Sequence, residues 1–99
     1  MSVTNRSQLQ ILSWNIHGAF SNIDGDRYCK LSDAEFLGQT SKYLLFGLIE
    51  TQHTAEDVPL LQLPGYKCYQ VCRSKLKRGR KSGGICVYVH ESISRVLVN

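Results

Sequence analysis

YLLFGLIETQHT, residues 43–54, decides how this chain folds. It begins with an apolar run long enough for a buried strand and changes abruptly to polar side chains at Glu50. Buried strands of about four to eight residues usually end at turn-forming residues such as Gly, Pro, Asn or Ser. A carboxylate at this position is therefore either a solvated strand exit or part of a site, and the rest of the chain must decide between them.

A second strand is predicted upstream, at residues 9–16, where LQILSWNI is apolar and β-branched and ends its strand at Asn15. A helix is predicted between the two strands, and strand, helix and strand in this order indicate a right-handed crossover with parallel strands. Asn15 and Glu50 should then meet at the carboxyl edge of the pair. Open α/β sheets bind their ligands at that edge.

The segment between the two strands is predicted to divide into a loop and a helix. Residues 17–31 are rich in Gly, Asn and Asp, which predicts a loop. Ser32 followed by Glu35 is a capping box, so the helix should begin there. Phe36 and Leu37 would then face the core.

The second half of the chain predicts an antiparallel hairpin. YKCYQVC at 66–72 and GGICVYVH at 83–90 are rich in aromatic and β-branched residues, and a long basic linker separates them. The connection at 54–65 contains both prolines and should hold one short helical turn. After the hairpin, a turn at 91–94 leads to a strand predicted at 95–98.

The composition is that of a globular chain, with 42% hydrophobic and 20% charged residues. These proportions exclude a collagen-like, disulfide-rich or wholly disordered chain. No apolar run approaches the roughly 18 residues that span a membrane, so no membrane partner is expected. Residues 1–8 are polar and have no apolar signal region, which predicts a flexible leader and an intracellular, not secreted, location.

The four cysteines are expected to be free thiols, because disulfides are rare in intracellular proteins. Cys68 and Cys72 are four residues apart on a predicted strand, which separates them by about 13 Å at the usual rise. That separation is too great for two ligands of one zinc ion.

The basic charge is concentrated in one segment, RSKLKRGRK at residues 73–81. This segment holds half of the 12 basic residues and no acidic residue, which leaves six basic against eight acidic residues elsewhere. Such clustering favours contact with nucleic-acid phosphates, with flanking tyrosines as stacking surfaces. A solvated loop or a nuclear import signal is the alternative. The predicted nucleic-acid-binding residues are Arg73, Lys75, Lys77, Arg78, Arg80 and Lys81.

A carboxylate beside a carboxamide at one sheet edge is a sensible Mg²⁺ site. Mg²⁺ typically binds one or two carboxylates, keeps several waters and shares the rest with phosphate oxygens. Glu50 could hold the ion and Asn15 a phosphate oxygen. His17 and His53 follow the two strand ends, so they could line the same cleft as proton donors or phosphate contacts, or be solvated loop side chains.

Three segments, taken in order, resemble the opening half of the endonuclease/exonuclease/phosphatase superfamily. They are ILSWNIHG, LLFGLIETQHT and LPGYKCYQVCRSKLKRGRKSGGICVYVHESI. They are most similar to the endonuclease domain of non-LTR (LINE-like) retrotransposons, in which a WN strand, an E-T strand end, a PGY strand, a basic loop and a GG strand occur in this order. The resemblance covers essentially residues 9–98.

The resemblance implies a four-layer α/β sandwich, of which this chain would be the first half, that hydrolyses DNA phosphodiester bonds with Mg²⁺ or Mn²⁺. It implies that Asn15 belongs to the active-site polar network, that Glu50 is the metal-binding carboxylate and that residues 73–82 lie against DNA. A reverse transcriptase domain downstream in the same polyprotein and a nuclear location would follow.

The chain departs from the family pattern in two places. Related sequences often read E-T-H where this one reads E-T-Q-H, so His53 is displaced by one position. The Tyr, Asp-x-Asn and Ser-Asp-His motifs of the second half are not found here. The expected enzyme is therefore the intact domain, and these 99 residues alone are expected to be inactive. The alternatives are a non-catalytic nucleic-acid-binding remnant and a superfamily phosphatase or phosphodiesterase that acts on lipid or nucleotide phosphates.

Overall fold

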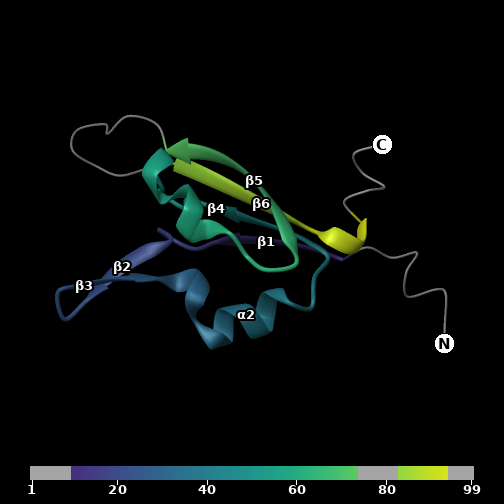
Figure 1. Ribbon diagram of the computed structural model, residues 1–99, viewed down its shortest axis with the longest axis horizontal. Helices are drawn as coiled ribbons and strands as arrows, with labels where there is room; N and C mark the ends of the chain where they lie inside the picture. The colour runs from purple at the N-terminus through teal and green to yellow at the C-terminus, as the bar shows by residue number, and fades with distance from the viewer. Residues whose placement is uncertain (1–9, 74–82, 94–99) are drawn as a thin grey trace.

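The centre of the structure is a four-stranded mixed sheet with the strand order β1-β4-β6-β5 (Figure 1). The computed structural model describes residues 10–73 and 83–93, which form a small mixed α/β domain. The predicted leader, most of the basic segment and the last predicted strand lie outside these residues. The four strands are β1 (Ile11–Asn15), β4 (Leu45–Ile49), β5 (Tyr66–Arg73) and β6 (Gly83–His90).

The pairing of the strands confirms two predictions and adds one feature. β1 and β4 are parallel, with Asn15 aligned with Ile49, and β5 and β6 form an antiparallel hairpin. β6 also pairs with β4 in the antiparallel sense, so that Ile49 is aligned with Ile85. The second strand of the hairpin therefore lies between β4 and β5, a neighbour relation that the sequence did not predict.

The prediction of a loop for residues 17–31 was wrong. These residues contain a hairpin of β2 (Phe20–Ile23) and β3 (Asp26–Cys29), followed by the short 3₁₀ helix η1 (Lys30–Ser32). The φ angles of Asp24 and Gly25 are 51° and 85°, and both are positive, as a two-residue type I′ turn requires. Asp-Gly between two strands is a strong hairpin signal, so the sequence contained the information.

The helix between β1 and β4 is α2 (Ala34–Thr40), and its N-cap is Asp33 rather than the predicted Ser32. The Asp33 Oδ1 atom accepts a hydrogen bond of 2.8 Å from the Glu35 backbone N–H. Ser32 is the last residue of η1, whereas Asp33 has the extended backbone that an N-cap residue adopts, with φ −70° and ψ 132°. The helix therefore begins one residue later than the capping-box pattern predicted.

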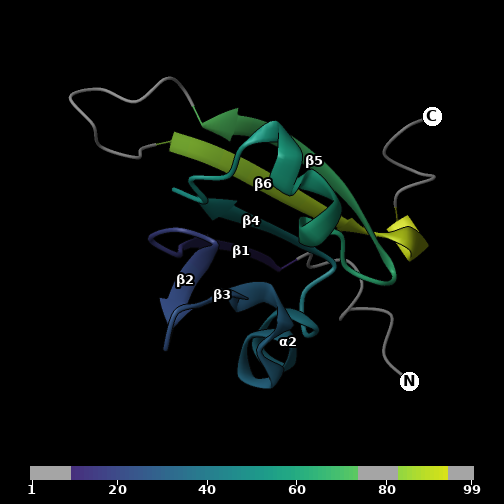
Figure 2. The same ribbon diagram turned by 60° about the vertical axis from the view of Figure 1, so that its left-hand side comes forward.

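The core lies between the sheet and the helical segments. Phe36 of α2 stacks on Trp14 with 5.5 Å between ring centroids, and it meets the edge of Phe46. The predicted burial of Phe36 is confirmed, whereas Leu37 is 40% exposed because it lies about 100° further around the helix. Figure 2 shows α2 and the β2–β3 hairpin on the same side of β1.

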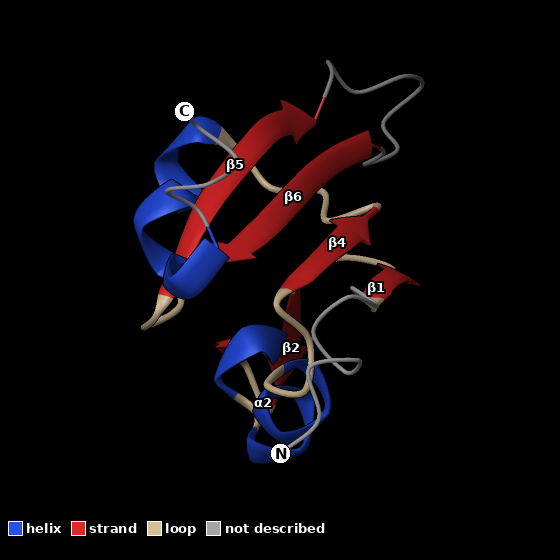
Figure 3. Ribbon diagram, turned by 90° about the vertical axis from the view of Figure 1, so that its right-hand side faces the viewer, coloured by secondary structure: helices blue, strands red, loops and turns tan. Residues whose placement is uncertain are grey.

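The connection between β4 and β5 is also helical. It forms the 3₁₀ helix η2 (Ala55–Leu61), which is longer than the single turn predicted. Tyr88 of β6 donates a hydrogen bond of 2.7 Å to the Leu61 carbonyl, which places η2 against the face of the sheet that carries the Tyr88 side chain. η2 and α2 lie on the same side of the sheet (Figure 3). No helix in the described ranges is long and apolar enough to cross a membrane.

The other face of the sheet is apolar and open to solvent. Strand register places the side chains of Ile49, Ile85 and Val71 next to one another on this face. β4 and β6 therefore carry apolar side chains on both faces, which is typical of strands that are buried on both sides. The large exposed apolar side chains of this face are Ile11, Ile49, Tyr69, Val71 and Ile85.

An ion pair joins the β2–β3 hairpin to η2. Arg27 Nη1 donates to Asp57 Oδ1 at 2.9 Å, and Asp57 Oδ2 accepts from the Thr54 backbone N–H at 2.9 Å, which closes a capping box. The Arg27 hydrogen bond is the main cause that holds the pKa of Asp57 below its ordinary value. The stability that this carboxylate contributes is therefore present above about pH 4 and is lost as the pH falls through the lowered pKa.

Asp57→Asn is expected to lower the free energy of unfolding at pH 7 by about 1 kcal/mol, through loss of the cap and of a half-exposed ion pair. The variant should also lose less stability than the parent between pH 5 and pH 3, because the titrating group is gone. Urea unfolding at both pH values measures this difference. Equal losses in parent and variant over that interval would show that Asp57 does not couple folding to protonation.

Candidate active site at the carboxyl edge of β1 and β4

Main-chain hydrogen bonds bring the carboxyl ends of β1 and β4 together. The Ile16 N–H donates to the Ile49 carbonyl at 3.2 Å, and the Gly18 N–H donates to the Glu50 carbonyl at 2.6 Å. The chain after Asn15 therefore continues alongside the chain around Glu50. The predicted meeting of these two residues at one sheet edge agrees with this arrangement.

Glu50 occupies an unusual backbone position. Its φ angle is 58°, which few residues other than Gly, Asn or Asp adopt, so its side chain leaves the line of the strand. The Gly83 backbone N–H donates to Glu50 Oε2 at 2.7 Å, across 33 residues of sequence. The Gln52 N–H in turn donates to the Gly83 carbonyl at 2.8 Å. The start of β6 thus fixes one carboxylate oxygen, while Oε1 makes no hydrogen bond or ion pair within the described ranges.

Asn15 is exposed at the end of β1. Its Oδ1 atom accepts from the His17 backbone N–H at 3.0 Å, which forms a short side-chain turn. This bond leaves the amide NH₂ group, a donor of two hydrogen bonds, available to a phosphate oxygen. His17 is exposed with a φ angle of 51°, and Lys30 Nζ donates to its carbonyl at 3.2 Å and to that of Ile16 at 2.9 Å.

His53 lies inside the protein. Its side chain is fully buried, with Nδ1 2.6 Å from Thr51 Oγ1 and Nε2 2.7 Å from Gln70 Oε1. The Gln70 oxygen can only accept, so Nε2 carries the proton and Nδ1 accepts from the Thr51 hydroxyl. His53 therefore links the chain beyond Glu50 to β5, and solvent does not reach its ring.

Gln70→Leu is expected to lower the free energy of unfolding by about 1–3 kcal/mol, because it leaves the His53 N–H buried without an acceptor. Gln70→Glu keeps an acceptor at the same place and should cost clearly less. Chemical denaturation of the two variants and the parent gives both values. Equal losses would mean that the bond to His53 contributes nothing and that packing of the side chain accounts for the change.

Two cysteines lie beside this buried chain. All four cysteines are free, as predicted, and Cys86 Sγ is 4.0 Å from His53 Nδ1. The hydrogen bond from Cys86 lowers the pKa of Cys68 to about 7, and the same interaction, with burial, raises the pKa of Cys86. Cys68 is partly exposed and Cys86 is buried, so Cys68 is the more accessible thiol of the pair.

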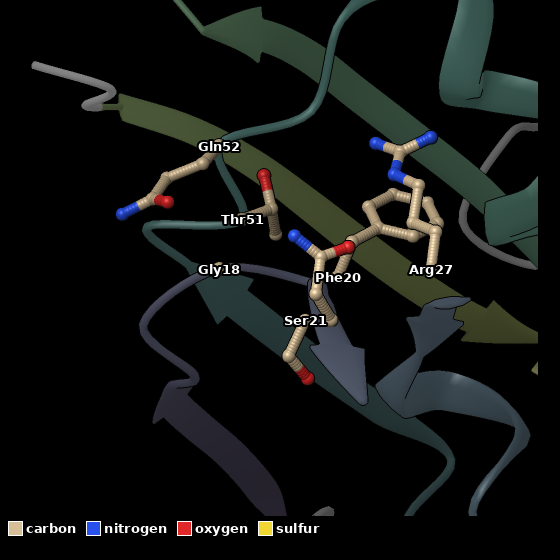
Figure 4. A pocket seen from close by; sticks show the side chains of 7 residues that line it. Gly18, Phe20, Ser21, Arg27, Thr51 and Gln52 are labelled. Carbon is tan, nitrogen blue, oxygen red and sulfur yellow. The ribbon is translucent and has the colours of Figure 1, made fainter. Parts of the chain in front are cut away.

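A polar pocket of about 60 Å³ adjoins the site. It lies between the β2–β3 hairpin and the two residues that follow Glu50, and Figure 4 shows the Thr51, Gln52, Ser21 and Arg27 side chains around it. Sequence reasoning missed this pocket because it missed the hairpin. It also missed Gln70 and Gly84, whose importance depends on pairing between distant strands.

The ends of the basic segment are anchored at the same edge. β5 ends at Arg73 and β6 begins at Gly83, and these two residues are aligned in the sheet. Of the predicted nucleic-acid-binding residues, the structure describes the backbone of Arg73, and the others lie outside the described residues. Gly83 contacts Glu50 directly, so β6 begins beside the carboxylate, and β5 ends at the aligned residue Arg73.

The donor set suits a metal ion that keeps most of its waters. No group of three His, Cys, Asp or Glu side chains is placed to hold a metal within residues 10–73 and 83–93. Glu50 nevertheless offers one open oxygen, and Mg²⁺ often binds through one or two carboxylates plus substrate phosphates. Comparison with family models, curated proteins and solved structures finds no match for this chain.

Proposed function

We propose that this chain is the N-terminal portion of an endonuclease/exonuclease/phosphatase-type domain that cleaves DNA with Mg²⁺ or Mn²⁺, as in the endonuclease of a non-LTR retrotransposon. The observation that carries the proposal is the Glu50 carboxylate. It sits at the carboxyl end of a parallel strand pair, one of its oxygens is held by the Gly83 N–H, and Asn15 ends the neighbouring strand. The basic segment that begins and ends at this edge supports a polyanionic substrate.

In this proposal the residues of the chain bind and orient. Glu50 would hold the metal ion, and the Gly83 N–H fixes one oxygen of its carboxylate. The Asn15 amide NH₂ donates to a non-bridging oxygen of the phosphate. The bound ion supplies Lewis-acid stabilisation of the charge that develops on the phosphoryl oxygens. The base that activates water would come from the second half of the domain.

The exposed apolar face of the sheet supports the sandwich architecture. Five large apolar side chains on one face are more than a free surface normally carries, and such patches usually mark an interface. A second sheet packed face to face would bury them, with the two sheets about 10 Å apart. We therefore propose that the four-layer sandwich is completed by residues beyond this chain. The resemblance to retrotransposon endonucleases is the basis for proposing a reverse transcriptase domain and nuclear import in the same protein.

The alternative is a non-catalytic nucleic-acid-binding remnant, and the position of the basic segment favours it as the second candidate. Neutralising six phosphates would make binding strongly dependent on salt, with log K falling by roughly 0.7–0.9 per contact for each unit of log salt. The 99-residue chain should then bind DNA without cleaving it. Replacement of the six cations by glutamine should flatten the salt dependence.

The test is to sequence the transcript through the codon for Asn99 and to assay the protein that the complete reading frame encodes. Plasmid nicking that needs Mg²⁺ or Mn²⁺ supports the endonuclease. If phosphoinositide, sphingomyelin or nucleotide phosphoesters are hydrolysed faster than plasmid DNA, the substrate is one of these compounds and not DNA. A stop codon directly after Asn99, with salt-sensitive binding and no cleavage, would leave the binding remnant as the function.

A further inference from the structure

The pocket beside Glu50 has the size of a single phosphate group. Its volume is about 60 Å³, which holds roughly four water-sized groups, as many as a phosphate group has oxygens. The walls come from two distant parts of the chain, the β2–β3 hairpin and the segment of Thr51 and Gln52. Tertiary structure alone brings these walls together.

Three polar side chains in the wall have no partner among the residues that the structure describes. Ser21, Asn22 and Gln52 make no side-chain hydrogen bond to any other residue of the described ranges. Each of them carries an O–H or an NH₂ group that can donate a hydrogen bond to an oxyanion. Several uncommitted donors that converge on one concavity are the usual composition of a ligand site.

Arg27 supplies a positive charge whose position is fixed. Its guanidinium carbon lies 3.8 Å from the centroid of the Phe20 ring, and Nη1 donates to Asp57 at 2.9 Å. One of its five N–H donors is used in that bond, which leaves others for a ligand. The Asp57 side chain is 8% exposed and the Arg27 side chain is 51% exposed, and of the two Arg27 lines the pocket, so the cation is the accessible member of the ion pair.

We infer that this pocket is a subsite for a phosphate group of the nucleic-acid backbone, adjacent to the phosphate that the Glu50 site would act on. The phosphate chemistry stands on the pocket itself, and only the nucleic-acid source rests on the proposed function. The source is favoured because Thr51 and Gln52 follow Glu50 directly, so a strand lying across Glu50 passes over the pocket. Lys30, held at the carbonyls of Ile16 and His17, adds a second cation at this edge.

The experiment titrates the isotopically labelled chain with inorganic phosphate in the absence of metal and follows its amide and side-chain NMR signals. Saturable shifts are expected at Ser21, Asn22, Gln52 and the Arg27 Nε–H. The double variant Ser21→Ala/Asn22→Ala and the single variant Gln52→Asn should each weaken the apparent affinity about threefold to tenfold. Neither replaces a side chain that bonds within the protein, so both should fold.

The matched control is Gln39→Ala, which removes an exposed amide from α2 and should leave phosphate affinity unchanged. Arg27→Gln is expected to have the largest effect, a loss of about tenfold or more, because it removes the charge. Shifts that are absent, that do not saturate, or that respond equally to the Gln39 and Gln52 variants would overturn the subsite.

The source of the phosphate is tested with two competing ligands. A short single-stranded DNA should displace inorganic phosphate from the pocket at lower concentration than phosphoinositide vesicles do, and the reverse order would overturn the nucleic-acid assignment. Glu56→Gln should leave metal-free phosphate binding within about twofold, since this exposed side chain in the first turn of η2 does not line the pocket. Phosphate binding without metal-dependent cleavage by the complete domain would therefore reject the proposed function and keep the phosphate subsite.

Discussion

Gly84→Ala is expected to lower the free energy of unfolding by at least about 3 kcal/mol, a large part of the stability of a small domain. Gly84 has a φ angle of 91°, where an alanine is strained by about 1–2 kcal/mol. An alanine Cβ would also overlap Thr51 Oγ1 and lie 2.9 Å from the Gln52 backbone N and 3.3 Å from His53 Nδ1. Hydrogen bonds hold these atoms, so relief requires backbone movement that typically costs a further 1–3 kcal/mol, as a rough range.

Gly25→Ala is the matched control for this prediction. Gly25 has nearly the same φ angle, 85°, but no atom lies within 4 Å of its added Cβ. It should therefore show the backbone strain alone, about 1–2 kcal/mol. Urea denaturation of the two variants separates the overlap from the strain. Similar losses in both would mean that the contact between β6 and the segment after Glu50 is loose.

Glu50→Gln in the complete domain is expected to reduce Mg²⁺-dependent plasmid nicking at least about a thousandfold. Glutamine has nearly the same shape, and its side-chain oxygen can still accept from the Gly83 N–H, so the fold should be retained. The negative charge that would bind the metal ion in the proposed site is lost. Conversion of supercoiled to open-circular plasmid, measured over a range of Mg²⁺ concentrations, gives the rate and the metal dependence.

Glu56→Gln provides the control for charge removal, since Glu56 is an exposed carboxylate in the first turn of η2. It should nick at the parental rate, and both variants should melt within a few degrees of the parent. A Glu50 variant that nicks normally would remove Glu50 from the metal site. If Glu50→Gln is inactive because it is unfolded, Glu50→Asp is tested in its place. This variant keeps the charge and should recover part of the nicking rate.

Several features of the fold could be read from the sequence because their signals are local. The apolar runs predicted β1 and β4, and the alternation in YKCYQVC and GGICVYVH predicted the β5–β6 hairpin. The Asp24-Gly25 turn was equally local and was overlooked in favour of a general loop composition. The choice of Asp33 over Ser32 as N-cap was less accessible, because it depends on Ser32 being the last residue of η1, a short helix that the capping-box pattern does not indicate.

The sequence by itself determined that two strand ends, Asn15 and Glu50, would share an edge, since a long connection that contains a helix favours a right-handed crossover and parallel pairing. It also determined that the cations would cluster in one segment. Only the tertiary structure decided that β6 lies between β4 and β5, which brings Gly83 to the Glu50 carboxylate and buries His53. The reason is physical: the order of strands depends on the summed packing of whole faces between residues far apart in the chain, and no local pattern encodes that sum.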